Sequence, residues 1–376
     1  MTSRRGFLGI AAPGSTLAAG GGLMASRPGA AAPETGTQSG AGERTRHFVP
    51  PIKFGLGGVT LGNEFEVITD EEAYKTLDAA WSAGVRYYDV SPWYGLGLAE
   101  RRFGSYLHNR NRDEYILSSK VGKLLKASKQ NNGRSTFPFS PSPNNVVFDY
   151  SADGVRRSVE DSLQRLGISD LDIVFVHDIS SDNTLLPTPW QQQFEIALKG
   201  AFPALARMKE HGIIRGWGIG VNTPEPILRV IQEADPDVCL LASQYSLIDH
   251  ANALNNVFPV ARQRNVTFVI GSSLNAGFIS GSPRYNYGKN SWDIPRKYIE
   301  KREKLRAVAA QYGVDLRTAA LRFSAAPDVA VALIVGARNE EQVLANVTSM
   351  QATIPPDFWA ELKRQNLIEQ NAPTPS

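Results

Sequence analysis

From residue 51 onward, short apolar runs alternate with longer amphipathic segments along most of the chain, and this alternation limits the fold more than any other feature. Unbroken apolar runs of about four to eight residues are typical of strands that are buried on both faces. The intervening segments carry apolar residues at helical spacing, as at Val155, Val159 and Leu163. The strands expected are 53–56, 86–90, 115–120, 171–177, 214–221, 238–243, 267–272 and 332–335.

Each expected strand is followed by an expected helix. The helices are 70–83, 99–107, 152–166, 201–211, 225–234, 251–264, 296–312 and 340–350, with an additional helical piece at 316–325. Eight such pairs predict an α/β protein with a single (β/α)₈ TIM barrel. The alternative is a doubly wound open sheet, which is disfavoured because Gly55, Gly57 and Gly58 do not have the G-x-G-x-x-G spacing.

The N-terminal segment reads as a targeting signal. Arg4 and Arg5 precede a weakly apolar stretch rich in alanine and glycine, and Ala30–Ala32 supplies small residues for cleavage. We therefore expect a twin-arginine-type signal at 1–32, a flexible linker at 33–50 and the barrel at 51–376, with export to a bacterial periplasm. The alternatives are a disordered basic tail and a cytoplasmic protein. Because Pro13 interrupts a stretch that is already short, stable membrane insertion is not expected.

Composition excludes several classes of function. The formal net charge is only +3 and no concentrated basic run is present, which argues against a nucleic-acid partner. The one cysteine, Cys239, rules out an intrachain disulfide and any site built from several cysteines. The five histidines form no H-x-H or H-E-x-x-H motif, so we expect no metal and no metal-dependent hydrolase.

Four ionisable residues stand where consecutive strands end. Asp89 closes the second strand and Tyr94 follows it, while Lys120 ends the third strand and His177 the fourth. Chemistry in such barrels lies at the carboxyl ends of the strands, and neighbouring strands are only ~4.8 Å apart. Each residue alone has a structural explanation, but their joint occurrence in barrel order predicts an Asp89–Lys120 pair beside Tyr94 and His177.

This grouping suits proton transfer between a carbonyl and an alcohol. A phenol normally ionises near pH ~10. A neighbouring ammonium favours the phenolate and lowers that pKa, so a tyrosine such as Tyr94 can act as general acid or base. Asp89 is expected to hold Lys120 in place, and His177 to hydrogen-bond the carbonyl oxygen and orient the substrate.

The segment Asp89-Val-Ser-Pro-Trp-Tyr-Gly95, followed by Lys120 and His177, resembles the catalytic tetrad of the aldo-keto reductases. The resemblance spans about 54–347 and is nearest to a bacterial branch that is similar to D-threo-aldose 1-dehydrogenase and pyridoxal 4-dehydrogenase. It is carried further by 147–151, 157–167 and 244–249. It implies direct hydride transfer between a nicotinamide cofactor and a substrate carbon, with Tyr94 as proton donor or acceptor and Lys120 and Asp89 tuning it.

The remaining strand ends are expected to hold the dinucleotide. Amide side chains suit the nicotinamide carboxamide, and small residues before a helix let backbone amides approach phosphates. The residues assigned in this way are Gly58, Asn222, Gln244, Gly271, Ser272, Leu274, Gly277, Gly336, Ala337, Arg338, Gln342 and Asn346. NAD and NADP stay open as alternatives, because the Arg338 guanidinium suits a 2′-phosphate but also a pyrophosphate or adenine.

The substrate is expected to be a small carbonyl or alcohol compound. A long loop over 121–149 supplies Phe137 and Phe139, which with Trp93 and His177 are assigned to the substrate pocket. An aldose similar to galactose or fucose, oxidised at C1, and a planar pyridine alcohol both suit such a lining. The alternative function is a cofactor-binding regulatory module with little turnover, like the potassium-channel β subunits. The chain is expected to be a monomer or a homodimer.

Overall fold

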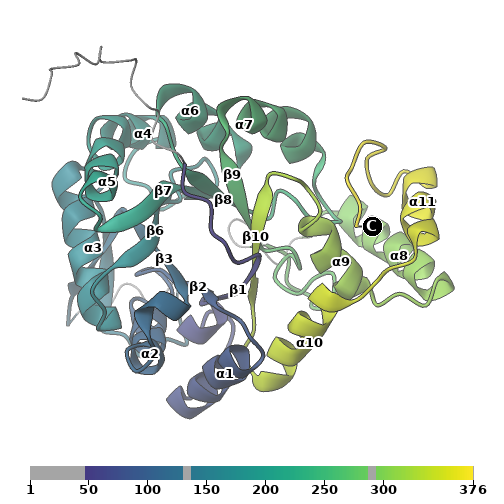
Figure 1. The fold of residues 1–376 in the computed structure, drawn as a ribbon, viewed down its shortest axis with the longest axis horizontal. Coiled ribbons are helices and arrows are strands. Elements are labelled where there is room, and N and C mark those ends of the chain that lie inside the picture. Colours follow the sequence, from purple (N-terminus) through teal and green to yellow (C-terminus); the bar gives the residue numbers. More distant parts are fainter. Residues whose placement is uncertain (1–46, 130–136, 287–293, 376) are drawn as a thin grey trace, which may run out of the picture. The chain divides into compact units, whose positions relative to one another are not determined.

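Eight parallel strands close into a barrel in the computed structural model, which describes residues 47–129, 137–286 and 294–375 (Figure 1). The strands follow the order β1-β10-β9-β8-β7-β6-β3-β2 around the barrel. They are β1 (Phe54–Gly57), β2 (Tyr87–Asp89), β3 (Ile116–Val121), β6 (Leu171–His177), β7 (Ile214–Val221), β8 (Val238–Ala242), β9 (Thr267–Gly271) and β10 (Ala330–Gly336). The predicted (β/α)₈ TIM barrel is confirmed.

Helices surround the barrel in Figure 1 and cover its outer face. They are α1 (Asp70–Ser82), α2 (Leu98–Leu107), α3 (Ala152–Leu166), α4 (Trp190–Lys199), α5 (Ala201–Glu210), α6 (Pro224–Glu233), α7 (Phe258–Arg264), α8 (Arg296–Gln311), α9 (Leu316–Ser324), α10 (Glu340–Gln351) and α11 (Pro356–Arg364). Local sequence sets several ends. A capping box between Thr69 and Glu72 begins α1, and Gly167, in the left-handed conformation at φ 66°, ends α3.

Two helices, α4 and α11, were not predicted, and one predicted helix is divided. The segment expected to be helical over 251–264 starts with a π-helical turn at Ala253–Val257 and becomes regular only in α7. Pro259 lies at the start of α7, where its missing N–H cannot continue an upstream helix.

The expected loop over 121–149 is instead partly a β-hairpin. Strands β4 (Lys123–Ala127) and β5 (Asn144–Phe148) pair antiparallel, with Lys123 opposite Phe148 and Ala127 opposite Asn144. Several of their side chains are exposed, so the sequence lacks the unbroken apolar run that marked the barrel strands. The hairpin follows β3 directly and stands next to the carboxyl end of the barrel.

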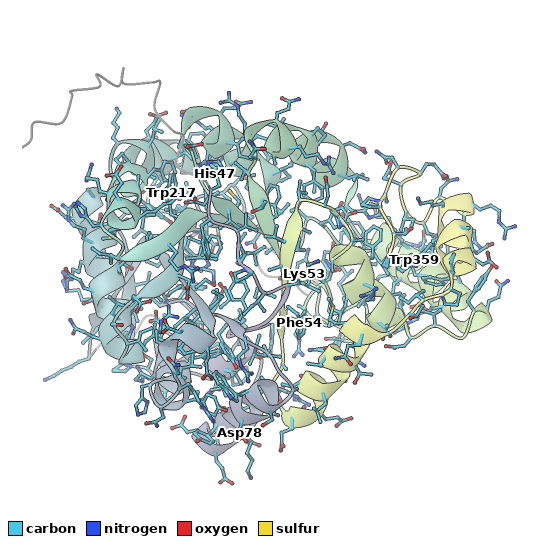
Figure 2. All side chains as sticks on the ribbon, in the orientation of Figure 1. His47, Lys53, Phe54, Asp78, Trp217 and Trp359 are labelled. Atoms are coloured by element: carbon cyan, nitrogen blue, oxygen red, sulfur yellow. The ribbon has the colours of Figure 1, made fainter. Side chains whose placement is uncertain are left out.

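The amino end of the barrel is closed by residues that precede β1. The backbone N–H of Phe48 donates to Asp237 Oδ1 at 2.7 Å, and Phe48 and Ile52 pack against the apolar residues inside the barrel. Figure 2 labels His47, where the described chain begins. Of residues 47–50, assigned to the linker in the sequence, His47, Phe48 and Pro50 are at least partly buried, and Val49 is exposed. The predicted signal and the rest of the linker lie outside the described residues.

Among the helices that the structure describes, none combines the length and the apolar character needed to cross a membrane.

Candidate active site

A cavity of about 860 Å³ opens at the carboxyl end of the barrel. Its wall includes all four residues predicted from the strand ends: Asp89, Tyr94, Lys120 and His177. They reach one place because β2, β3 and β6 are neighbours in the barrel and each brings its residue to the carboxyl end.

A buried ion pair forms the floor of the cavity. Lys120 Nζ donates to Asp89 Oδ2 at 2.6 Å and to the Val90 carbonyl oxygen at 3.0 Å. The other carboxylate oxygen of Asp89 accepts from Ser118 Oγ at 2.6 Å. Burial lowers the pKa of Lys120, and the Asp89 carboxylate opposes that shift. The pair therefore keeps an ammonium charge in a place where an isolated one would be strongly disfavoured.

Tyr94 lies over this ammonium. Lys120 Nζ is 4.6 Å from the centre of the Tyr94 ring, and the His177 ring meets Tyr94 edge-on with its centre 5.9 Å away. The turn that presents Tyr94 depends on Gly95, which has φ 63°. A Cβ at Gly95 would lie 2.2 Å from the Gly62 carbonyl oxygen, so no larger residue fits there.

His177 is held as a neutral ring. Ser91 Oγ lies 3.2 Å from His177 Nδ1 and also accepts from the Trp93 N–H at 3.1 Å. Burial, followed by the charges of Lys123 and Lys120, holds the pKa of His177 well below its usual range. If the Ser91 hydroxyl donates to Nδ1, the ring proton lies on Nε2, where it can be donated to a substrate oxygen.

Among the charged residues in or beside the cavity that were not predicted from the sequence are Lys123, Asp178 and Glu64. Lys123 Nζ pairs with Asp178 Oδ2 at 2.5 Å and lies 4.2 Å from the centre of a Trp93 ring. Asp178 and Glu64 both line the cavity. Asp178 follows His177 directly, so its position after a strand end was an available signal. Nothing in the local pattern pointed to Glu64 or Lys123.

The other side of the cavity is lined by most of the residues assigned to the cofactor. These are Asn222, Gly271, Ser272, Leu274, Gly277, Gly336, Arg338, Gln342 and Asn346. The turn after β9 has left-handed conformations at Ser272, Asn275 and Ala276. At the next turn, the side chain of Asn339 accepts from the Gln342 N–H at 2.9 Å and begins α10. Arg338 also pairs with Glu66, which comes from the loop after β1.

Four assigned residues lie elsewhere in the described structure. Gly58 packs below the cavity and donates to the Asp89 carbonyl oxygen at 2.8 Å, while its neighbours Gly57 and Val59 line the wall. Ala337 is fully buried, and its carbonyl oxygen accepts from Thr60 Oγ1 at 2.7 Å.

The other two are Gln244 and Phe139. The left-handed turn at Ser243 follows β8, and Ala242 rather than Gln244 contributes to the wall. Phe139 is 42% exposed, whereas Phe137 lines the cavity and packs edge-on against Trp93, with ring centres 5.1 Å apart. Trp93 and Phe137 thus form the apolar wall.

Comparison with known proteins agrees with this geometry. A model of the aldo/keto reductase family matches residues 53–366. D-threo-aldose 1-dehydrogenase from Pseudomonas sp is 32% identical over 330 residues, covering 85% of this chain and 94% of that protein. Pyridoxal 4-dehydrogenase from Microbacterium luteolum is 32% identical over 333 residues, covering 84% and 94%.

Two solved structures share the fold. The holo form of an aldo-keto reductase from Bacillus halodurans has a TM-score of 0.64 at 23% identity, covering 85% of this chain and 95% of that one. A glycerol dehydrogenase from Gluconobacter oxydans has a TM-score of 0.63 at 20% identity, covering 88% and 97%.

Proposed function

The chain belongs to the aldo/keto reductase family, and from this premise we propose that it is a dehydrogenase that oxidises an aldose similar to galactose or fucose at C1. The coarser activity, oxidoreduction between a carbonyl and an alcohol with NAD(P), follows from the family. The observation that carries the proposal is the contact of Tyr94 with the Lys120–Asp89 pair beside His177, within one cavity.

The cavity wall fits a nicotinamide dinucleotide. Asn222 offers a side-chain amide, Ser272 a turn with a left-handed backbone, and Arg338 a guanidinium just before the amino end of α10. We propose that these residues hold the nicotinamide and phosphate parts, with Gln342 and Asn346 near the adenine. The cofactor, when bound, supplies the hydride acceptor, so the protein itself has to provide placement and proton transfer.

Proton transfer is assigned to Tyr94. As hydride leaves the substrate carbon, the alcohol proton passes to Tyr94 Oη, and the C–O bond becomes a carbonyl. The ammonium of Lys120, 4.6 Å from the centre of the Tyr94 ring, favours negative charge on the phenol. Asp89 keeps that ammonium in place, and neutral His177 donates from Nε2 to the reacting oxygen and thereby orients it.

We also propose that the protein is exported by the twin-arginine route. The support is the Arg4–Arg5 pair, together with a single cysteine, Cys239, which is buried in the barrel and needs no oxidising compartment. Replacing both arginines by lysine should leave the protein in the cytoplasm of the expressing bacterium, whereas unchanged periplasmic recovery would refute export by this route.

The activity is tested with the purified protein on a panel of aldoses, simple alcohols and aldehydes, using NAD and NADP in turn and following the absorbance of the reduced nicotinamide. We expect turnover that is fastest with an aldose. If a dinucleotide binds but no compound is turned over, the protein is instead a cofactor-binding regulatory module. If only compounds other than sugars react, the oxidoreductase stands and the aldose assignment fails.

A further inference from the structure

One carboxylate at the cavity takes no part in the mechanism above. Asp178 lies directly after His177, with its backbone in the left-handed region at φ 49°. This conformation, together with a bond from its N–H to the Gly220 carbonyl oxygen at 2.8 Å, fixes the residue at the mouth of the barrel. Its Oδ2 atom is 3.4 Å from His177 Nε2, the atom that is to hold the reacting oxygen.

One carboxylate oxygen of Asp178, Oδ2, has a hydrogen-bond partner within the protein. Oδ2 accepts from Lys123 Nζ at 2.5 Å. Lys123 is itself buried, so its ammonium depends on Asp178 as its partner. Within the described part of the chain, no donor is at hydrogen-bond distance of the other oxygen, Oδ1. Because Asp178 lines the cavity, it presents an acceptor with unused capacity to whatever binds there.

This position has opposite consequences for two kinds of substrate. A carbonyl compound with no neighbouring hydroxyl would place an electron-rich oxygen beside a carboxylate and return nothing for it. A compound with a hydroxyl on the adjacent carbon can hold its first oxygen at His177 and donate its second O–H to Asp178. Hydrogen bonds to ionised acceptors are among the stronger ones.

We propose that Asp178 binds the hydroxyl on the carbon next to the reacting carbon, and thereby selects α-hydroxy substrates such as aldoses over simple alcohols and aldehydes. This rests on the proposed function, in which Tyr94 and His177 hold the reacting oxygen. Asp178 is then a specificity-determining residue, and Lys123 is a positioning residue that holds its carboxylate in place.

A second carboxyl extends the polar part of the wall. Glu64 lines the same cavity from the loop after β1, and the charge of Lys123 acts on it. Burial raises the pKa of Glu64 to about 7, so near neutrality it exists in both donor and acceptor forms. A ring with several hydroxyls therefore meets polar partners beyond the first two oxygens, which a short aliphatic alcohol would not use.

The test requires no altered protein at first. The wild-type enzyme is assayed with the aldose that it oxidises fastest and with the 2-deoxy form of that sugar. Loss of one hydrogen bond to a charged group predicts kcat/KM lower by roughly 10- to 100-fold for the 2-deoxy sugar. Equal kcat/KM values for the two sugars, or faster turnover of simple aldehydes than of any aldose, would overturn the role of Asp178.

Variants then assign the effect to the residue. Asp178→Asn alone leaves Lys123 buried without its partner, so the Lys123→Met/Asp178→Asn double variant accompanies it. Both are expected to lower kcat/KM for the aldose more than for the 2-deoxy sugar, so that the ratio of the two kcat/KM values approaches 1. Asp113→Asn, the same change at an exposed residue, is the matched control.

The outcomes separate this inference from the proposed function. An equal fall with both sugars in the double variant would refute hydroxyl recognition while the oxidoreductase stands. Absence of turnover by wild type with every sugar and both cofactors would instead refute the proposed function itself.

Discussion

Both ends of the barrel contain buried carboxylates, but the two ends differ in what surrounds these groups. At the amino end, Asp172 accepts from Arg112 at 2.7 Å, from Arg215 at 2.9 Å and from the Leu117 N–H at 2.8 Å. Asp237 accepts from three donors as well: Lys209, the Phe48 N–H and the Trp217 N–H. Both carboxylates are almost completely inaccessible, and they join strands to the residues that close the barrel.

At the carboxyl end, the corresponding charges face a cavity. Asp89 is used up by Lys120 and Ser118, but the ammonium that it holds lies against Tyr94. Asp178 lines the cavity, and among the residues that the structure describes only its Oδ2 has a partner. The difference teaches that buried charge by itself marks no site in this fold. A site arises where charged groups at a cavity wall have hydrogen-bonding capacity that their neighbours in the protein do not use.

The largest effect should come from removing one atom at the carboxyl end. Tyr94→Phe removes the proton donor and acceptor, and we expect turnover to fall by roughly 10²- to 10⁴-fold. Dinucleotide affinity and thermal stability should be kept, because the ring remains over Lys120. Steady-state kinetics and fluorescence titration with the cofactor measure both quantities.

The control is Tyr115→Phe, which makes the same change at the start of β3, near the amino end. It is expected to leave kcat/KM within about twofold. Retained turnover in Tyr94→Phe would show that the proton comes from elsewhere and would remove the chemical distinction between the two ends.

A smaller effect concerns stability at the cavity wall. Burial raises the pKa of Glu64 from 4.5 to about 7, so over this range the folded protein holds a proton that the unfolded chain has lost. Stability should therefore fall as pH rises from about 4.5 to about 7 and change no further through this group above that. Glu64→Gln lacks this loss, and relative to wild type it should gain roughly 3 kcal/mol between pH ~4.5 and pH ~8.

Denaturant midpoints at the two pH values measure this difference, with Glu114→Gln as the exposed control near the amino end. A gain of the same size in Glu114→Gln, or a gain for Glu64→Gln that is larger at low pH, would contradict the buried carboxyl at the cavity.

The smallest effect is expected where the paired groups are most exposed. Glu66 pairs with Arg338 at the cofactor side of the cavity, and both side chains are more than 40% exposed. Glu66→Gln frees the guanidinium for a 2′-phosphate and removes a negative charge, so the Kd ratio should shift about tenfold toward NADP. Titration with both dinucleotides measures it, and Glu71→Gln on α1 is the control. A proportional change in both affinities would exclude Arg338 as the discriminating residue.

Sequence predicts the barrel and the four residues on or just after β2, β3 and β6 because both depend on order along the chain. The end of each unbroken apolar run marks the end of a strand. Neighbouring strands then bring Asp89, Lys120 and His177 side by side. The direction in which a side chain points after a strand depends on the backbone conformation of one turn residue. That conformation cannot be inferred from the sequence. The left-handed Ser243 is such a case: Ala242 and not Gln244 contributes to the cavity wall, and the assignment of Gln244 to the cofactor stays a prediction.

The charged residues beyond the tetrad were missed for a different reason. Lys123 reads as one more polar residue in a loop, and only the pairing of β4 with β5 brings it beside Asp178. Whether both oxygens of a carboxylate have partners among the described residues, as in Asp172, or only one does, as in Asp178, depends on groups 40 or more residues away. No local pattern encodes that difference.

The central claim is tested most directly by comparing Asp89→Asn with Asp237→Asn, with kcat/KM measured per folded molecule and the free energy of unfolding measured for each. We predict that Asp237→Asn lowers stability by about 3 kcal/mol and leaves kcat/KM within twofold, since its partners serve only the closed amino end. Asp89→Asn should lower kcat/KM per folded molecule at least ~100-fold, whatever its effect on the free energy of unfolding. The reason is that Lys120 is no longer held beside the Tyr94 ring. Equal losses of kcat/KM in the two variants, or full activity in Asp89→Asn, would contradict the account.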